Sequence, residues 1–121
     1  MIGYATIGSN DLEKAKAFYD RVLVPLGAQR AFASDRMQGY AGAGGAMLAV
    51  CRPYDEQKAF PGNGNMVALQ APSPEVIQQV HALALASGAA DEGAPGERMP
   101  GFYGAYFRDL DGNKVCVYKM G

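Results

Sequence analysis

The segment NDLEKAKAFYDRVLVPLG, residues 10–27, sets the pattern for the fold. Its apolar side chains recur at spacings of three and four residues, with charged side chains between them. This period predicts an amphipathic helix with one buried face. Asn10 is the expected N-cap, with Glu13 three residues later as in a capping box, and Pro25 and Gly27 are expected to end the helix.

Short segments of strand character lie on both sides of this helix. Residues 1–8 precede it, and no helical period is found between Gly27 and Arg52. Polar and glycine-rich residues divide the latter region into short pieces, which is typical of a three-stranded meander. The expected strands of the meander are Ala28–Ala33, Arg36–Ala41 and Ala46–Cys51. The first half therefore has the order β-α-β-β-β.

The second half repeats this order. Residues 66–71 are expected to form a strand, and Ser73-Pro74 starts a second helix as N-cap and first helical residue. Gly88 ends this helix and follows Gly27, the end of the first helix, by 61 residues. An internal repeat of this length indicates two copies of one structural unit.

The end of the chain completes the second unit. Residues 91–101 are rich in glycine and proline and are expected to form a loop with room for one short strand. Phe102–Arg108 and Lys114–Lys119 are expected to pair as a hairpin around the turn at residues 109–113.

These patterns predict one α+β domain of two βαβββ modules. The modules cover about residues 1–52 and 65–121, and residues 53–64 link them. Each helix covers only one face of its strands. Two such halves side by side are expected to form a curved, eight-stranded mixed sheet around a hollow, with the helices outside.

Composition narrows the possible partners. The 121 residues are 49% apolar and 19% charged, and the net charge is −1. No basic stripe is present to neutralise phosphates, so a nucleic-acid partner is not expected. No apolar run is long enough for a membrane span, and the first residues do not resemble a signal peptide. Two cysteines without CxxC spacing are expected to be reduced thiols of a cytoplasmic protein.

Three motifs in order resemble one family. They are the helix pattern from Asp11 to Gly27, the segment Pro61–Leu69 and the hairpin Tyr106–Val115. Together they are similar to the glyoxalase/bleomycin resistance protein/dioxygenase superfamily, also called the vicinal oxygen chelate superfamily. The resemblance implies an enzyme or binding protein of the predicted fold, usually a homodimer, whose enzymes hold a divalent metal in the hollow.

The metal ligands that the resemblance implies are absent. Family enzymes place histidines on the first and fifth strands and a glutamate on the last strand, and these positions fall on Tyr4, Met66 and Cys116. Phenol, thioether and thiol are poor ligands for Mg²⁺, Mn²⁺ or Ni²⁺, and suit Cu(I) or haem iron at best. The single histidine, His81, lies on the second helix and is expected to be a surface or hydrogen-bonded residue. No metal or other cofactor is therefore predicted.

The period of two along strands assigns residues to the hollow. The expected pocket residues are Tyr4, Thr6, Met66, Gln70, Cys116 and Tyr118, with Arg52 and Tyr103 as contacts at its rim. Such a lining of apolar, aromatic and a few polar side chains suits a small organic molecule.

The catalytic residues, if there are any, remain unknown from the sequence. Cys116 and Tyr4 are the candidates, as nucleophile and proton donor. A nucleophilic thiol needs a lowered pKa, and the competing interpretation of Cys116 is a small buried core residue. Tyr4 is equally well interpreted as an amphipathic wall residue.

Three functions are compatible with this sequence. The favoured one is binding of a small organic molecule without a metal, in the manner of bleomycin resistance proteins. The alternative is a metal-dependent lyase resembling lactoylglutathione lyase, or a dioxygenase, which would need a divalent metal on non-standard ligands. A third is a structural or regulatory protein whose hollow is filled by its own side chains. A homodimer is expected in each case.

Overall fold

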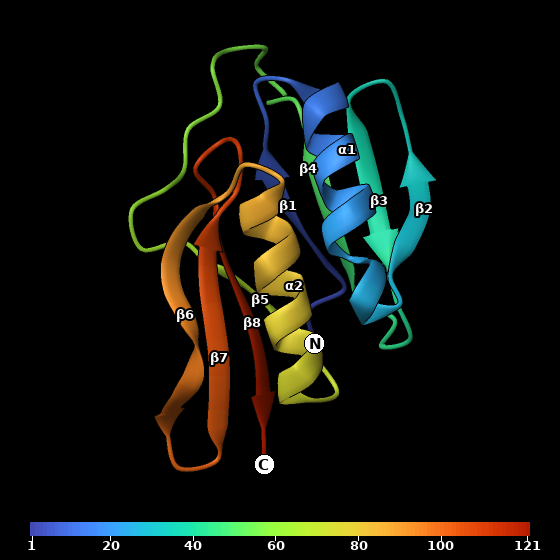
Figure 1. Cartoon of the computed structure of the whole chain (residues 1–121). Helices are drawn as coiled ribbons and strands as arrows, with labels where there is room; N and C mark the ends of the chain where they lie inside the picture. Colours follow the sequence, from blue (N-terminus) through green and yellow to red (C-terminus); the bar gives the residue numbers. More distant parts are fainter.

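A computed structural model describes all residues from Met1 to Gly121. Each half of the chain forms one βαβββ module (Figure 1). The elements of the first module are β1 (Tyr4–Gly8), α1 (Leu12–Val22), the 3₁₀ turn η1 (Val24–Leu26), β2 (Gln29–Ala33), β3 (Met37–Ala41) and β4 (Met47–Cys51). Those of the second module are β5 (Val67–Gln70), α2 (Pro74–Ala86), β6 (Ala90–Met99), β7 (Phe102–Arg108) and β8 (Lys114–Met120).

The strands form two four-stranded mixed sheets with equivalent topology. Their orders are β1-β4-β3-β2 and β5-β8-β7-β6, with one parallel pair in each, β1 with β4 and β5 with β8. This confirms the predicted fold class. The eight strands do not form one continuous ladder, however, because β1 and β5 are edge strands of separate sheets.

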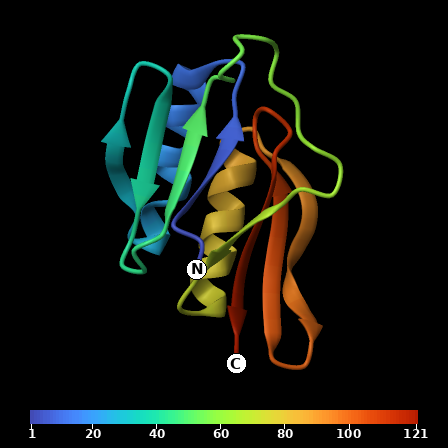
Figure 2. The ribbon, with the colours of Figure 1, turned by 180° about the vertical axis from the view of Figure 1, so that it is seen from behind.

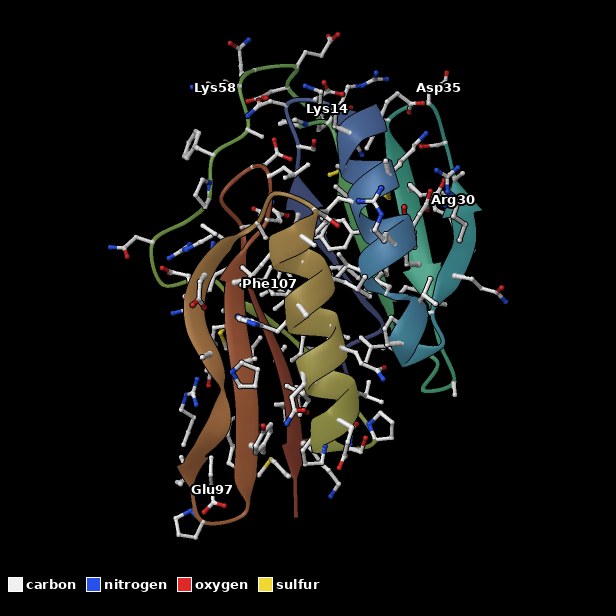
Figure 3. All side chains as sticks on the ribbon, in the orientation of Figure 1. Lys14, Arg30, Asp35, Lys58, Glu97 and Phe107 are labelled. Atoms are coloured by element: carbon white, nitrogen blue, oxygen red, sulfur yellow. The ribbon has the colours of Figure 1, made fainter.

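The helices cover one face of both sheets. Helix α2 packs on β6, β7 and β8, and α1 packs against β4 and α2. Figure 2 shows both sheets in front of the helices, with their uncovered faces turned to the viewer. One core of 17 buried residues joins both modules. Phe107 of β7 points toward α2 in this core, and its ring lies 6.1 Å from that of Phe18 on α1 (Figure 3).

The start of α1 differs from the prediction. Asp11, rather than Asn10, is the N-cap, and its carboxylate accepts a hydrogen bond from the Lys14 backbone N–H at 3.1 Å. The Asn10 side chain instead donates to the carbonyl of Ala59 and accepts from its N–H. Asn10 thus fixes the long loop between β4 and β5. The α-helix ends at Val22, earlier than predicted, because Pro25 lies in the separate turn η1, and Gly27 ends that turn at φ 72°.

The start of α2 agrees with the prediction. The Ser73 hydroxyl accepts a hydrogen bond from the Val76 N–H at 3.3 Å, and Pro74 is the first helical residue. The helix ends at Ala86, and Gly88 follows at φ 104°, a conformation that glycine adopts without strain.

The predicted loop at residues 91–101 is wrong, since most of it belongs to β6. This ten-residue edge strand pairs with β7 through three register shifts. Proline and glycine are tolerated at sheet edges and bulges, where a ladder bond or a side chain can be missing. The irregular register hides the strand from a search for strict alternation.

Hydrogen bonds at one end of the molecule join the two modules. The Asn113 amide donates to the Gly8 carbonyl at 2.9 Å, and the Asp111 carboxylate accepts from the Asn10 N–H at 2.8 Å. The Tyr19 hydroxyl donates to Asp109 at 2.6 Å. The β7–β8 turn, predicted from its Asp and Asn residues, therefore also connects the two modules by hydrogen bonds.

None of the helices is both long enough and apolar enough to cross a lipid bilayer.

Candidate functional site

The uncovered sheet faces carry the residues that strand alternation assigns to the hollow. Val67 and Leu69 of β5 pack against the helical core, whereas Ala68 and Gln70 are exposed. Tyr4 and Thr6 of β1 are likewise exposed, and Tyr4 retains 62% of its surface. The alternation therefore gives the correct face for these strands. Whether the residues bind a ligand remains a prediction.

The larger of the two main hollows, here called the main cleft, has a volume of about 850 Å³. It lies where the two modules meet, beside the edge strand β5, and most of its lining is apolar. Three predicted pocket residues line it, namely Met66, Gln70 and Tyr118. The full lining is Ile2, Ala5, Leu23, Leu26, Ala28, Tyr40, Gly42, Ala43, Gly44, Ala46, Met47, Leu48, Met66, Val67, Ala68, Leu69, Gln70, Ala71, Pro72 and Tyr118.

Tyr40 contributes an apolar wall to this cleft, because its hydroxyl is already used. The hydroxyl donates toward Asp20 and the Lys16 carbonyl, at 3.0 and 3.1 Å. Burial and the Asp20 carboxylate raise the pKa of Tyr40 well above its ordinary value. Asp20 also receives a bidentate hydrogen bond from Arg30. Gln70 and Tyr118 are thus the polar side chains that the cleft offers to a ligand.

A second cleft, of about 400 Å³, lies near the end of the molecule where the β7–β8 turn is hydrogen-bonded to the first module. Thr6 and Met66 line it together with Lys114 and Asn113, and the loop residues 60–65 contribute to its wall. Met66 therefore borders both clefts. This second cleft is the more polar of the two.

The remaining predicted pocket residues lie outside both clefts. Tyr4 stands opposite Met47 on the open face of the first sheet. Arg52 is exposed and donates to the Asp35 carbonyl at 2.5 Å. Tyr103 packs on the helical side of the second sheet, where its hydroxyl accepts a hydrogen bond from Gln78 of α2. The structure thus brings Tyr103 to the face opposite the predicted pocket.

Cys116 lies on the uncovered face of β8 but retains only 1% of its surface. Burial raises the pKa of its thiol, against opposing effects of a hydrogen bond with Tyr106 and of the positive charges of Arg98 and Lys114. A raised thiol pKa leaves little thiolate near neutral pH, which does not suit a nucleophile. His81 on α2 is 6% exposed, and its Nε2 atom forms a hydrogen bond with the Asp91 carboxylate at 3.0 Å, as expected for a structural histidine.

Beside Cys116 lie two cations, of which the sequence predicts Lys114 on this face but not Arg98. Tyr106 stands opposite Cys116 in the β7–β8 ladder. The Arg98 guanidinium carbon lies 5.3 Å from the centroid of the Tyr106 ring, and the Lys114 ammonium nitrogen lies 5.6 Å from it. Alternation along the hairpin could have placed Tyr106 on this face. Arg98 could not have been placed, because its strand was interpreted as a loop.

An aromatic pair adjoins this group. The rings of Phe102 and Tyr118 stack at 5.5 Å with an angle of 4° between their planes. Gly104 stands opposite Tyr118, and a Cβ atom there would lie 3.1 Å from the Phe102 ring. Glycine therefore leaves the space in which the two rings meet.

The side chains at the family's metal positions do not fit a divalent metal. Met66 retains 47% and Tyr4 62% of its surface, while Cys116 is buried at 1% and stands opposite Tyr106 in the β7–β8 ladder. No group of three or more His, Cys, Asp and Glu side chains is placed to hold a metal ion. Divalent first-row metals prefer several imidazole and carboxylate donors converging on one point.

Comparison with known proteins relates the whole chain to one superfamily. The family model described as "Glyoxalase/Bleomycin resistance protein/Dioxygenase superfamily" matches residues 1–117. A crystal structure of a glyoxalase/bleomycin resistance protein from Albidiferax ferrireducens T118 is 36% identical, with a TM-score of 0.91 and coverage of 98% of this chain and 97% of that one. No curated protein matches the chain.

More distant structures share the fold. A glyoxalase/bleomycin resistance protein/dioxygenase family enzyme from Burkholderia phytofirmans PsJN has 19% identity, a TM-score of 0.77 and coverage of 98% of each chain. A lactoylglutathione lyase from Agrobacterium tumefaciens has 21% identity and a TM-score of 0.70, with coverage of 98% of this chain and 92% of that one. The architecture and the match along nearly the full length agree: this chain belongs to the glyoxalase/bleomycin resistance protein/dioxygenase superfamily.

Proposed function

We propose that this protein binds a small organic molecule in the main cleft and does so without a divalent metal. The observation that carries the proposal is the cleft itself, about 850 Å³ with a mainly apolar lining and two available polar side chains. Ligand sites of small molecules commonly have this size and this mixture of an apolar wall and a few polar groups. The poor donor set at Tyr4, Met66 and Cys116 supports the metal-free form of the proposal.

Ligand binding is tested with a neutral aromatic probe, 2-naphthol, and a variant that fills the cleft. Ala68 is exposed on β5 and lines the main cleft, so Ala68→Phe reduces its volume without disturbing the core. Ala17→Phe, on the exposed side of α1, is the matched control. We expect a titration to show binding to wild type and to the control, and a Kd at least about tenfold higher for Ala68→Phe. Equal binding to all three proteins, or to none, contradicts the proposal.

Metal independence is tested separately. Purified protein is analysed for its metal content, and thermal unfolding is followed with added Ni²⁺, Mn²⁺ and Zn²⁺. A metal that binds only the folded state raises the unfolding temperature. We expect substoichiometric metal and no rise. One tightly bound divalent metal per chain, with a rise of several degrees, would show that other ligands form a metal site and would favour the lyase or dioxygenase alternative.

We also infer that the protein is a homodimer that works in a reducing compartment such as the cytoplasm. Large apolar side chains remain exposed on or beside the open sheet faces, including Ile2, Tyr4, Met66 and Met120. Contiguous exposed apolar surface commonly marks an interface. Both cysteines are free thiols. Light scattering coupled to size exclusion measures the mass in solution, and a monomer at all concentrations would contradict the dimer.

A further inference from the structure

We propose that the open face of the second sheet selects ligands with a negatively charged group, and that Arg98 and Lys114 bind a carboxylate attached to an aromatic or amphipathic body. This inference rests on the proposed function and names the class of ligand. Arg98 and Lys114 are called the cation pair below.

The cation pair has no acidic partner. Five ion pairs are found in the structure, and neither Arg98 nor Lys114 takes part in any of them. A third cation on this face, Arg108, stands opposite Lys114 and is neutralised by Glu92 at 2.9 Å. The cation pair therefore leaves two positive charges uncompensated on one sheet face. Both cations lie within 5.6 Å of the centroid of the Tyr106 ring, so a carboxylate bound beside this ring would gain a charge-assisted hydrogen bond from the cation that it meets and attraction from the other.

The nearest acidic residue in sequence does not supply this anion. Glu97 precedes Arg98 and stands opposite Tyr103, whose side chain lies on the helical side of the sheet. Directly opposed residues of an antiparallel pair project to the same face. Figure 3 shows Glu97 at the far end of β6, beside the β6–β7 turn. The uncovered face keeps its positive charge.

Two glycines of β6 create the place where Arg98 lies. A Cβ atom at Gly93 would lie 3.0 Å from Nη2 of Arg98, and one at Gly96 would lie 3.1 Å from Nη1. The same Gly93 Cβ would lie 2.9 Å from Cδ1 of Tyr106. The guanidinium also donates to the Ala94 carbonyl at 2.6 Å. The bare backbone of β6 thus lets Arg98 fold back over the Tyr106 ring instead of extending into solvent.

The side chains along β8 also indicate the shape of the ligand beyond its carboxylate. Lys114, Cys116 and Tyr118 share one face of β8, and the first and last are about 13 Å apart along the strand at ~3.3 Å per residue. Tyr118 stacks on Phe102 and lines the main cleft, whereas Lys114 lines the second cleft. A molecule with a flat apolar body near Tyr118 and a carboxylate toward Lys114 matches this sequence of surfaces.

The test compares two probes of similar shape, one charged and one neutral, 2-naphthoate and 2-naphthamide. We expect wild type to bind naphthoate about tenfold more tightly than naphthamide, the gain of one or two charge-assisted hydrogen bonds in a partly exposed site. Raising NaCl from about 20 to about 300 mM should weaken naphthoate binding and leave naphthamide unchanged, because salt screens exposed charges.

Variants assign the preference to residues. Arg98→Gln and Lys114→Gln should each reduce the preference for naphthoate, and the double variant should abolish it while naphthamide binding persists. Arg36→Gln is the matched control, because Arg36 lies 5.4 Å from the ring centroid of Tyr54 in the same kind of contact elsewhere. Its preference should equal that of wild type. Lys114→Met keeps the apolar stem and separates loss of charge from loss of packing.

The outcomes distinguish this inference from the proposed function. Equal affinity of wild type for both probes overturns the charge selection and leaves the binding function intact. A preference that survives in the double variant also overturns the assignment to Arg98 and Lys114. Failure of both probes and of 2-naphthol to bind overturns the binding function and this inference with it.

Discussion

Tyr19 on α1 and Asp109 at the β7–β8 turn meet in a buried hydrogen bond of 2.6 Å across 90 residues of sequence. The second oxygen of the Asp109 carboxylate accepts from the N–H groups of Asp111 and Asn113. The turn that closes the last hairpin is therefore held by a residue from the first helix. This bond links the two modules through polar groups, in addition to the shared apolar core.

Removing the Tyr19 hydroxyl should destabilise the fold. Tyr19→Phe leaves a buried carboxylate oxygen with one donor fewer, and the loss of a hydrogen bond to a charged group costs about 1.5–3 kcal/mol. Urea unfolding should show this as a lower midpoint with an unchanged slope. Tyr54→Phe, at a side chain that is 87% exposed, is the control and should unfold like wild type. An unchanged midpoint for Tyr19→Phe would show that the bond contributes nothing net.

The same residue makes stability depend on alkaline pH. Burial, together with the Asp109 charge and hydrogen bond, raises the pKa of Tyr19 well above its ordinary value of 10.0. The folded state therefore holds the phenolic proton more tightly than the unfolded chain. This contribution is complete below pH 10 and is lost as pH rises toward the folded pKa. We expect the free energy of unfolding to fall more steeply between about pH 10 and 11 in wild type than in Tyr19→Phe.

Both thiols should be protected in the folded protein. Cys51 is 8% and Cys116 1% exposed, and burial raises the Cys116 pKa, so neither should react quickly with Ellman's reagent near pH 8. In concentrated guanidinium chloride both should react at once. Fast modification of Cys116 in the native protein would instead revive its assignment as a nucleophile. A Cys51→Ala variant identifies which thiol reacts.

Adding one methyl group at Gly93 should disturb the cation pair. The Cβ of Gly93→Ala would lie 2.9 Å from the Tyr106 ring, so the ring and the Arg98 guanidinium must move. We expect weaker selection of 2-naphthoate over 2-naphthamide and an unfolding midpoint slightly below wild type. Gly3→Ala is the control, because no atom lies within 4 Å of a Cβ there and Gly3 lines neither cleft. Unchanged selectivity would show that the position of Arg98 does not depend on this glycine.

The sequence predicts the helices and the order of elements because those depend on local features. The Ser73-Pro74 start and the apolar period of residues 12–26 act within a few residues and are read directly. The prediction of Asn10 as the N-cap of α1 is wrong because its side chain forms hydrogen bonds with Ala59. This contact spans 49 residues, and no local sequence pattern contains it. For the same reason the sequence does not predict the hydrogen bond between Tyr19 and Asp109, which spans 90 residues.

The candidate site was predicted in part. Alternation gives the face of Met66, Gln70 and Tyr118, which share the main cleft. It does not predict the position of Tyr103, which was expected at the rim of the pocket but packs on α2. Arg98 depends on the register shifts of β6, and those follow from tertiary pairing with β7 rather than from the composition of residues 90–99.

The separation of β1 and β5 has a mechanical consequence. No ladder joins these edges, while Asn113 and Gly8 tie the modules together at one end. The main cleft lies toward the opposite end, where Ile2 and Pro72 form part of its wall. The two modules are therefore joined by polar contacts at the turn of residues 109–113 and by the shared apolar core, but not by strand pairing. Because no strand pairing crosses between β1 and β5, the distance between these two edges is set by side-chain packing in the shared core and not by backbone hydrogen bonds.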